Sequence, residues 1–380
     1  MAATDDSNAT LSDELDALDP AVRARLGATF DPAWLIARAK ILREQGAAAN
    51  NRVSGGVSAP RPDELAPLRD ADRARLEAMG NEALGRGEIA LCVLAGGMAT
   101  RMGGVVKALV EIEPGLRFLD ARLGEQRAVS HRSGKPLPVW LMTSEATDAP
   151  IRDALAKADA PSHVATFRQG NQLRLDQRGR LFRDAQGAPS LYATGHGDVV
   201  DALRSSHLLD EFRERGGKWV LITNLDNLGA SVDPLYAGAA IDSGAQLLVE
   251  AAHREPTDKG GAPVRHGGRI QILEEFRLPE GFDPMSVPVM STNTMWVSAD
   301  ALATTDVPWS WFTVEKKVDG RTAIQFERLV QELTAVLETR YVEVPREGDA
   351  SRFLPVKDPA ELERRRPVLL SALRARGFMP

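Results

Sequence analysis

Residues 89–107 read IALCVLAGGMATRMGGVVK, an apolar run that leads directly into paired glycines and then into two cations. The apolar run predicts a buried β-strand. Gly96 and Gly97 let the backbone turn tightly and bring its N–H groups close to an anion, while Arg101 and Lys107 add charge-assisted contacts to phosphate oxygens. The stretch therefore predicts a phosphate-binding turn at the carboxyl end of a strand.

The spacing of the glycines separates this turn from two common nucleotide-binding motifs. The run fits neither the dinucleotide fingerprint G-x-G-x-x-G nor the P-loop G-x-x-x-x-G-K-[ST], which disfavours a nicotinamide dehydrogenase and a P-loop NTPase. A glycine-rich turn after a strand is often no more than a turn. The order Gly-Gly-x-x-x-Arg-x-Gly-x-x-x-Lys is much more specific.

Short apolar runs alternate with amphipathic ones after residue 86. This alternation predicts an α/β domain with a mostly parallel sheet, in which ligands bind beyond the carboxyl ends of the strands. Strands are predicted at 89–94, 138–143, 219–223, 246–252, 292–297 and 341–344, and helices at 149–157, 198–209, 209–215, 234–243, 324–337 and 359–376.

The part of the chain before residue 86 has helical spacing, interrupted by a loop rich in Gly, Ser, Asn and Pro at 50–62. We therefore expect three consecutive parts: an N-terminal helical segment (1–85), a catalytic domain (86–345) and a C-terminal segment with a terminal helix (346–380). Within the first part, helices are predicted at 11–18, 20–26, 32–45 and 63–84.

Composition excludes several classes of function. The 380 residues are 43% hydrophobic with a formal net charge of -6, which suits a soluble protein with a large core and disfavours nucleic acid as a partner. No apolar run approaches the roughly 20 residues of a membrane span. The single cysteine, Cys92, cannot form an intramolecular disulfide. We expect a cytoplasmic protein that binds neither nucleic acid nor membrane.

Further segments resemble, in the same chain order, the eukaryotic-type family of UTP-glucose-1-phosphate uridylyltransferases and UDP-N-acetylglucosamine pyrophosphorylases. The resemblance spans about residues 89 to 360. It implies a GT-A-like (Rossmann-like) α/β nucleotidyltransferase fold, UTP and a sugar 1-phosphate as substrates, and Mg²⁺ as cofactor. The matching segments are the loop above, Phe167-Arg168-Gln169, Gly195-His196-Gly197-Asp198, Asn224-Leu225-Asp226-Asn227-Leu228-Gly229-Ala230, Lys259-Gly260-Gly261, Leu273-Glu274, Ser291-Thr292-Asn293, Val318-Asp319-Gly320 with Ile324-Gln325, and Arg352-Phe353-Leu354-Pro355-Val356-Lys357.

The same resemblance implies a set of site residues. Its catalytic cations are Arg101, Lys107 and Lys357, which face the phosphates, and Asp226 is its Mg²⁺ ligand. The implied nucleotide-binding residues are Leu94, Ala95, Gly96, Gly97, Gln169, Gly195 and Asp226. The implied sugar-phosphate-binding residues are His196, Asn224, Glu274 and Asn293.

The residues themselves support some of these roles and leave others open. Asp226 follows the strand at 219–223 directly, which suits a hard cation at a strand end, but a turn or helix-capping Asp looks the same. Glu274 alternates with Ile270 and Ile272 and so shares the core-facing side of a strand. The glycines beside His196 leave it room to approach a ligand, and Asp198 is equally suited to cap the helix that follows.

Four departures from the family pattern keep the function open. Ala99 stands at a usual glycine and Val106 at a usual proline, so a non-catalytic nucleotide-binding relative stays an alternative. Ser291 and Thr294 stand where glucose-type enzymes usually have asparagines. We therefore predict UDP-glucose synthesis first, with a UDP-N-acetylhexosamine or broad UDP-sugar pyrophosphorylase as the alternative, and a monomer or small homo-oligomer.

Overall fold

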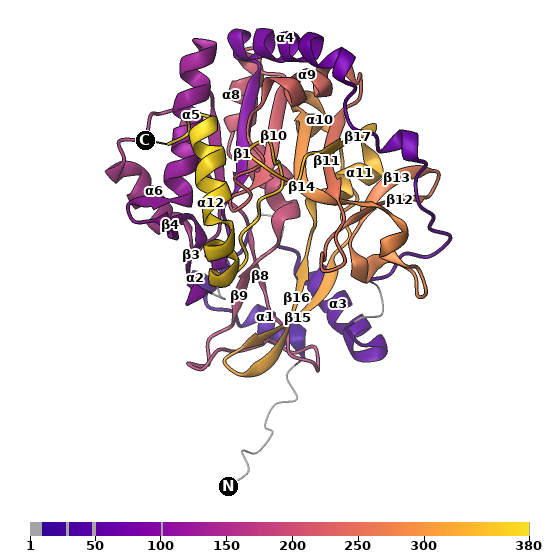
Figure 1. The fold of residues 1–380 in the computed structure, drawn as a ribbon. Coiled ribbons are helices and arrows are strands. Elements are labelled where there is room, and N and C mark those ends of the chain that lie inside the picture. Colours follow the sequence, from indigo (N-terminus) through magenta and orange to yellow (C-terminus); the bar gives the residue numbers. More distant parts are fainter. Residues whose placement is uncertain (1–9, 28–29, 48–50, 100–101, 380) are drawn as a thin grey trace. The chain divides into compact units, whose positions relative to one another are not determined.

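The computed structural model describes residues 10–27, 30–47, 51–99 and 102–379. By their internal contacts these residues form two compact units, which Figure 1 shows as ribbons. The sheet unit comprises Ser54–Arg168, Val199–Pro308 and Val330–Pro380, and the insert unit comprises Met1–Val53, Gln169–Asp198 and Trp309–Leu329.

A seven-stranded sheet in the order β17-β11-β14-β10-β1-β6-β7 forms the centre of the sheet unit. Neighbouring strands are parallel except at β14, which is antiparallel to both β10 and β11. The expected α/β class with a mostly parallel sheet is confirmed. The strands are β1 Ile89–Leu94, β6 Val139–Thr143, β7 Val164–Arg168, β10 Trp219–Asn224, β11 Leu247–His253, β14 Val289–Ser298 and β17 Thr339–Val344.

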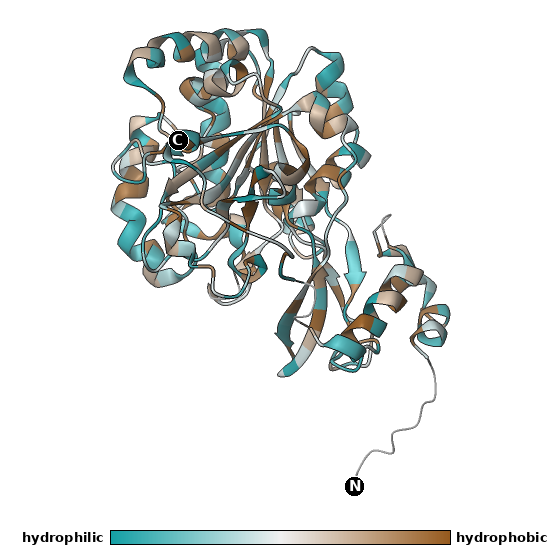
Figure 2. Cartoon of the chain, turned by 90° about the vertical axis from the view of Figure 1, so that its right-hand side faces the viewer, coloured by the Kyte–Doolittle hydropathy of each residue, from teal (hydrophilic) through white to brown (hydrophobic). Residues whose placement is uncertain are grey.

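Helices pack on the sheet because most residues of its strands are apolar and buried. Figure 2 shows brown, hydrophobic stretches along the central strands. Between helices α4 and α9 the backbones touch: a Cβ added at Gly80 would lie 1.9 Å from the Pro234 carbonyl oxygen, so only glycine fits there. The helices of this unit are α4 Asp70–Arg86, α5 Phe118–Ser133, α6 Asp148–Lys157, α7 Val199–Ser205, α8 Leu208–Glu214, α9 Pro234–Asp242, α10 Ala299–Thr304, α11 Leu333–Val336 and α12 Pro359–Ala375.

The sheet unit also has three short hairpins beside the main sheet. They pair β2 (Met98–Ala99) with β3 (Val105–Val106), β4 (Glu111–Glu113) with β5 (Leu116–Arg117), and β12 (Ala262–His266) with β13 (Arg269–Leu273).

The insert unit combines the N-terminal helices with two hairpins from later parts of the chain. Its core brings Leu35 and Leu42 of one helix against Phe326, and the rings of Trp34 and Phe326 meet edge to face. Its elements are α1 Leu11–Asp16, α2 Pro20–Ala24, α3 Pro32–Gln45, β8 Asn171–Leu173, β9 Leu191–Ala193, β15 Phe312–Val318 and β16 Arg321–Glu327.

Most predicted elements are found within a residue or two of their bounds, and the helix at 32–45 is found at those bounds. The predicted helix at 324–337 is wrong in its first part. Ile324 and Phe326 lie in strand β16, where both face the core of the insert unit, because a short apolar run fits either period. The helix predicted from residue 63 starts at Asp70, after Pro67, which pairs with Glu343 in an isolated bridge.

Sequence reasoning missed helix α5 altogether. Arg122, Glu125 and Gln126 in its middle are buried, so its inward face is not an apolar stripe and gives no helical hydrophobic period. The three expected parts follow one another in sequence, whereas the two compact units do not. The insert unit takes residues 169–198 and 309–329 from later in the chain, because they pack with the N-terminal helices. Among the described residues, none of the helices has the length and apolar character needed to cross a membrane.

Candidate active site

The glycine-rich loop follows β1 where the prediction placed it. Leu94 is in register with Met142 of β6 on one side and with Asn224 of β10 on the other. The Ala95 N–H donates to the Met142 carbonyl at 2.8 Å. A Cβ added at Gly97 would meet no atom within 4 Å, so the loop has an open side that a ligand can approach. Arg101 lies outside the described residues.

The two departures in this loop cause no backbone strain. Ala99 lies in strand β2, paired with Val105, and so has an extended backbone rather than a positive φ. Val106 has φ -63°, the value that a proline at this position would impose. The backbone at these two described positions therefore does not require the usual glycine and proline.

Lys107 and Asp226 meet at the carboxyl ends of β1 and β10. The Lys107 Nζ lies 2.5 Å from the Asp226 Oδ2, and both side chains are mostly buried. Parallel pairing of the two strands brings the residues together although 119 positions separate them in sequence. A predicted phosphate-binding cation and a predicted metal ligand are thus direct partners.

The residues around Asp226 fit a magnesium ion that takes only one or two of its ligands from the protein. Among the described residues no group of three or more His, Cys, Asp or Glu side chains is placed to hold a metal. Mg²⁺ is commonly held by one or two carboxylates, with the remaining positions taken by substrate phosphates and water. Asp226, at the mouth of a phosphate loop, suits that arrangement and not a metal cage built from protein alone.

Asn224 and Asn293 lie side by side at the same edge of the sheet. The Asn293 Nδ2 donates to the Asn224 Oδ1 at 2.8 Å, while the Asn293 Oδ1 is buried and has no partner among the described residues. Asn293 has φ 57°, and the register of β14 against β11 shifts between Glu250 and Ala251. A bulge of this kind redirects a side chain, here leaving a hydrogen-bond acceptor for a hydroxyl donor.

Glu274 follows strand β13 with its carboxyl group largely removed from water. Burial, with a smaller contribution from Glu275, raises the pKa of Glu274 to about 7. The Gln331 Nε2 donates to the Glu274 Oε1 at 2.8 Å. The site residues predicted for the sugar therefore include a carboxyl group that titrates near neutral pH.

Lys357 ends a segment that is fastened to the loop carrying Asp226. The Asn227 side chain donates to the Arg352 carbonyl at 3.0 Å and accepts from the Leu354 N–H at 2.8 Å. The Lys357 side chain is exposed and lines a surface cleft of about 870 Å³ together with Asp258 and Glu361. The segment is thus held at one end and presents its lysine to solvent at the other.

The remaining predicted residues lie in the insert unit. Gln169 is buried, and its Oε1 has no partner among the described residues, so an acceptor is available there. Burial lowers the pKa of His196 to about 4, which keeps its imidazole neutral at physiological pH. Gly195 has φ 92°.

The structure gives a different reason for the glycines around His196. A Cβ at Gly195 or Gly197 would lie 2.7 Å from backbone atoms of Arg328, so close packing, rather than room for a ligand, requires them. Asp198 ion-pairs with Arg328 and accepts from the Gly170 N–H at 2.5 Å. It therefore joins the two ends of the segment 169–198 to each other and to the segment 309–329.

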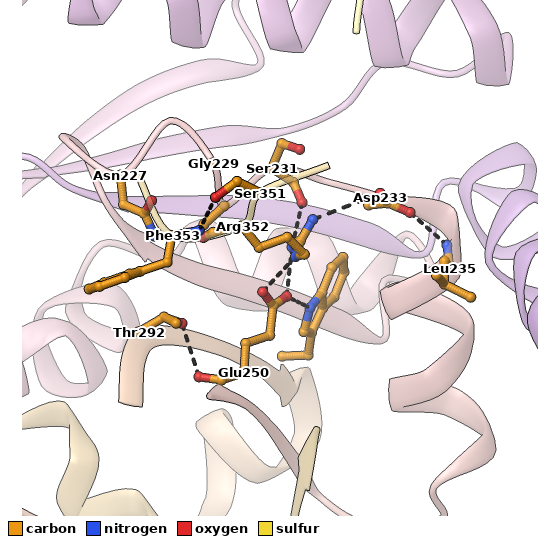
Figure 3. A network of polar contacts seen from close by, with 12 residues as sticks. Asn227, Gly229, Ser231, Asp233, Leu235, Glu250, Thr292, Ser351, Arg352 and Phe353 are labelled. Carbon is orange, nitrogen blue, oxygen red and sulfur yellow. Dashed lines mark hydrogen bonds and ion pairs between the residues drawn. The ribbon is translucent and has the colours of Figure 1, made fainter. Parts of the chain in front are cut away.

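Sequence reasoning missed a buried polar network beneath the Asp226 loop (Figure 3). Arg352 forms two hydrogen bonds of 2.6 Å with Glu250, which also accepts from the Trp296 Nε1 at 2.9 Å. The Arg352 guanidinium also stacks on the Tyr236 ring, 4.2 Å from its centroid. One signal was available: a glutamate in the middle of the apolar strand β11 needs a buried partner.

A mostly parallel sheet, a glycine-rich loop after β1 and a Lys–Asp pair beside it are features that suit an α/β protein that binds its ligand at the carboxyl ends of its strands. The chain belongs to the UTP-glucose-1-phosphate uridylyltransferase family, whose model matches residues 43–370.

Among curated proteins, a UTP-glucose-1-phosphate uridylyltransferase from Musa acuminata is 30% identical over 301 residues, which cover 72% of this chain and 62% of that protein. The chain spans less than two thirds of the length of this relative and of two further plant relatives, from Hordeum vulgare and Solanum tuberosum.

Two solved structures share the fold. The UDP-N-acetylglucosamine pyrophosphorylase from Trypanosoma brucei superposes with a TM-score of 0.75 at 21% identity, covering 93% of this chain and 81% of the other. A UDP-glucose pyrophosphorylase from Leishmania major gives 0.69 at 23% identity, covering 91% and 79%. At such identities the likeness concerns the fold alone.

Proposed function

We propose that this protein joins UTP to glucose 1-phosphate, forming UDP-glucose and pyrophosphate. The observation that carries the proposal is the contact of Lys107 with Asp226 at the end of a glycine-rich loop, in a chain of this family. Lys107 offers a cation for phosphate and Asp226 a carboxylate for a metal ion. Both lie beyond the carboxyl ends of parallel strands, where such sheets bind their ligands.

The reaction is an in-line attack of a sugar-phosphate oxygen on the α-phosphorus of UTP, with pyrophosphate leaving. The nucleophile is already an anion, so no general base is needed. The protein must bring two polyanions together and offset their charge, which Lys107, Arg101 and Lys357 do by position and electrostatics. Lys107 exchanges its contact with Asp226 for a contact with phosphate when the nucleotide binds.

Asp226, once released by Lys107, would hold Mg²⁺ together with phosphate oxygens. The ion would supply charge neutralisation at the phosphates. Leu94, Ala95 and Gly97 form the strand end and open loop that receive the phosphates.

Base and sugar recognition are assigned to separate groups. The unpartnered Gln169 Oε1 suits the N3–H donor of uracil, and a base without that donor would leave the buried acceptor unpaired. The unpartnered Asn293 Oδ1 and the Glu274 carboxyl suit sugar hydroxyls. His196, Gly195 and Asn224 complete the proposed set.

The test is Mg²⁺-dependent pyrophosphate release from UTP with glucose, galactose, N-acetylglucosamine and N-acetylgalactosamine 1-phosphates. Lys107→Ala should lose at least about 100-fold in rate. Lys157→Ala, which changes an exposed lysine at the end of α6, is the matched control and should keep wild-type activity.

Three results separate the alternatives. Release with glucose 1-phosphate supports the proposal, whereas release with N-acetylhexosamine 1-phosphates alone replaces it with the acetylhexosamine alternative. UTP binding without release from any sugar refutes the enzymatic proposal and leaves a nucleotide-binding relative.

We further propose that the protein works in the cytoplasm. Its single cysteine is buried in β1, where burial raises the pKa of the Cys92 thiol, so it offers no reactive thiolate. The assembly state, expected to be a monomer or small homo-oligomer, stays a prediction.

A further inference from the structure

The loop that carries Asp226, residues 224–231, has an unusual set of hydrogen-bond partners. Asn224 is the last residue of β10, and residues 225–231 cross the protein interior from there towards α9 without a helix or strand. Buried carbonyl oxygens in such a segment need donors from elsewhere. Here arginine side chains supply them to six of its eight carbonyl groups.

Arg122 of helix α5 holds the loop from one side. Its Nη2 donates to the carbonyls of Asn224 and Asn227, both at 2.9 Å, and its Nη1 donates to that of Ala230 at 2.8 Å. Glu125 balances its charge at 2.7 Å and accepts from the Val232 N–H, just beyond the loop, at 2.7 Å. Arg122 and Glu125 are each 1% exposed, so this pair is fixed within the core.

Arg352 holds the end of the loop. Its Nη2 donates to the Ser231 carbonyl at 3.0 Å while Glu250 balances its charge. A Cβ at Gly229 would lie 2.8 Å from the Arg352 carbonyl carbon, so the two backbone segments are in direct contact. Figure 3 shows Ser231, Gly229 and Ser351 gathered around Arg352.

Arg376 reaches the same loop from the C-terminal end of helix α12. Its Nη1 donates to the carbonyls of Leu228 at 3.2 Å and Gly229 at 2.9 Å. Its Nη2 donates to the carbonyls of Asp349 at 3.0 Å and Ser351 at 2.8 Å, on the segment that leads to Lys357. One guanidinium group therefore bridges the loop of Asp226 and the segment of Lys357.

We propose that Arg122, Arg352 and Arg376 are positioning residues, which set the place of Asp226 relative to Lys107 and couple it to the Lys357 segment. Their catalytic consequence rests on the proposed function. The C-terminal helix is then part of the scaffold of the active site. A guanidinium is suited to this task because it presents five donors in a fixed plane, whereas an ammonium is a single point of donors.

Arg376→Lys tests the proposal most cleanly. It keeps the charge and leaves both buried ion pairs intact, but the three donors of a lysine lie on one atom and cannot replace the four carbonyl contacts that the Arg376 guanidinium makes. Arg374→Lys, an exposed position on the same helix, is the matched control. We expect kcat to fall at least about 10-fold, because a displacement of about 1 Å can cost as much as 100-fold. The Mg²⁺ concentration for half-maximal rate should rise several-fold, a change that reduced folding stability alone does not produce.

Two further measurements test the positioning role, and the first of them does not depend on activity. Amide hydrogen exchange in the ligand-free protein should rise in both 224–232 and 350–357 for Arg376→Lys and in neither for Arg374→Lys. In Arg376→Ala, added millimolar guanidinium should restore part of kcat.

If the wild type is active and Arg376→Lys retains its kcat, its Mg²⁺ requirement and its exchange pattern, the inference is overturned and the proposed function stands. If the wild type releases pyrophosphate with no sugar 1-phosphate, the proposed function fails. The exchange pattern alone then decides whether Arg376 positions the loop.

Discussion

The Lys107 ammonium group lies 2.5 Å from the Asp226 carboxylate, so the two charges expected to contact UTP and its metal ion neutralise each other when neither is bound. Under the proposed function, binding would separate this pair. Phosphate oxygens would offer anions to Lys107, and the Asp226 carboxylate would then be available to hold a cation.

Asp226→Asn should therefore act on binding and catalysis in opposite directions. We expect kcat to fall by about 100-fold or more because the metal loses its carboxylate. UTP affinity without divalent metal should rise several-fold, because Lys107 no longer has a competing anion. Calorimetric titration with UTP in the presence of a chelator measures this, with the exposed Asp153→Asn as control. An unchanged metal-free affinity would show that the ion pair does not restrain Lys107.

Glu250→Gln should destabilise the fold strongly. Removing this carboxylate leaves the buried Arg352 guanidinium with only the longer contact of 3.8 Å to Asp233, in a core where Glu250 is fully buried and Arg352 nearly so. Breaking a buried ion pair in this way costs about 3–5 kcal/mol, measurable by urea unfolding.

Asp242→Asn removes one partner of a similar two-bonded Arg–carboxylate pair, but at the protein surface, and so serves as a comparison for Glu250→Gln. Arg75 contacts Asp242 through two hydrogen bonds of 2.6 and 2.9 Å, but both side chains are well exposed. Solvent screens such a pair, so Asp242→Asn should lower the free energy of unfolding much less than Glu250→Gln does. Similar losses in the two variants would mean that burial is not what makes the Glu250 pair important.

Glu274→Gln should change the pH dependence of stability. The pKa of Glu274 is about 7 in the folded protein and about 4.5 when exposed, so unfolding releases its proton between those pH values. The protonated Glu274 carboxyl group therefore favours the folded state. Its contribution to stability is fully present below about pH 4.5 and is lost as the pH rises towards 7. Between pH 4.5 and pH 8 the free energy of unfolding of the variant should rise relative to that of the wild type by at most about 3 kcal/mol, and by less where solvent screens the charge.

Urea unfolding of both proteins at several pH values measures this difference. Parallel pH profiles for the wild type and the Gln variant would show that Glu274 titrates normally.

Gly197→Ala should destabilise the insert unit, because the new Cβ would lie 2.7 Å from the Arg328 carbonyl carbon and the Leu329 nitrogen. Overpacking of this kind costs about 1–3 kcal/mol in thermal or urea unfolding. Gly56→Ala, where a Cβ meets no atom within 4 Å, should be close to neutral. If Gly197→Ala is equally neutral, close packing does not explain this glycine.

Local sequence features predicted every strand of the main sheet except β7, because most of these strands are short apolar runs bounded by polar turns, as in Ile89–Leu94 and Trp219–Asn224. They failed where neighbours in space determine the conformation. Phe326 and Ile324 became part of a strand because β15 pairs with them. Helix α5 escaped notice because Arg122 and Glu125 share its buried face with apolar residues and so break the apolar stripe.

The sequence by itself determined the α/β class, the glycine-rich loop after β1 and the family, since these depend on local patterns and on motif order. Tertiary structure alone decided that Lys107 meets Asp226, and that Arg122, Arg352 and Arg376 converge on residues 224–231. The physical reason is that a buried charge or carbonyl is stable only with a partner, and the fold, not the spacing along the chain, supplies it.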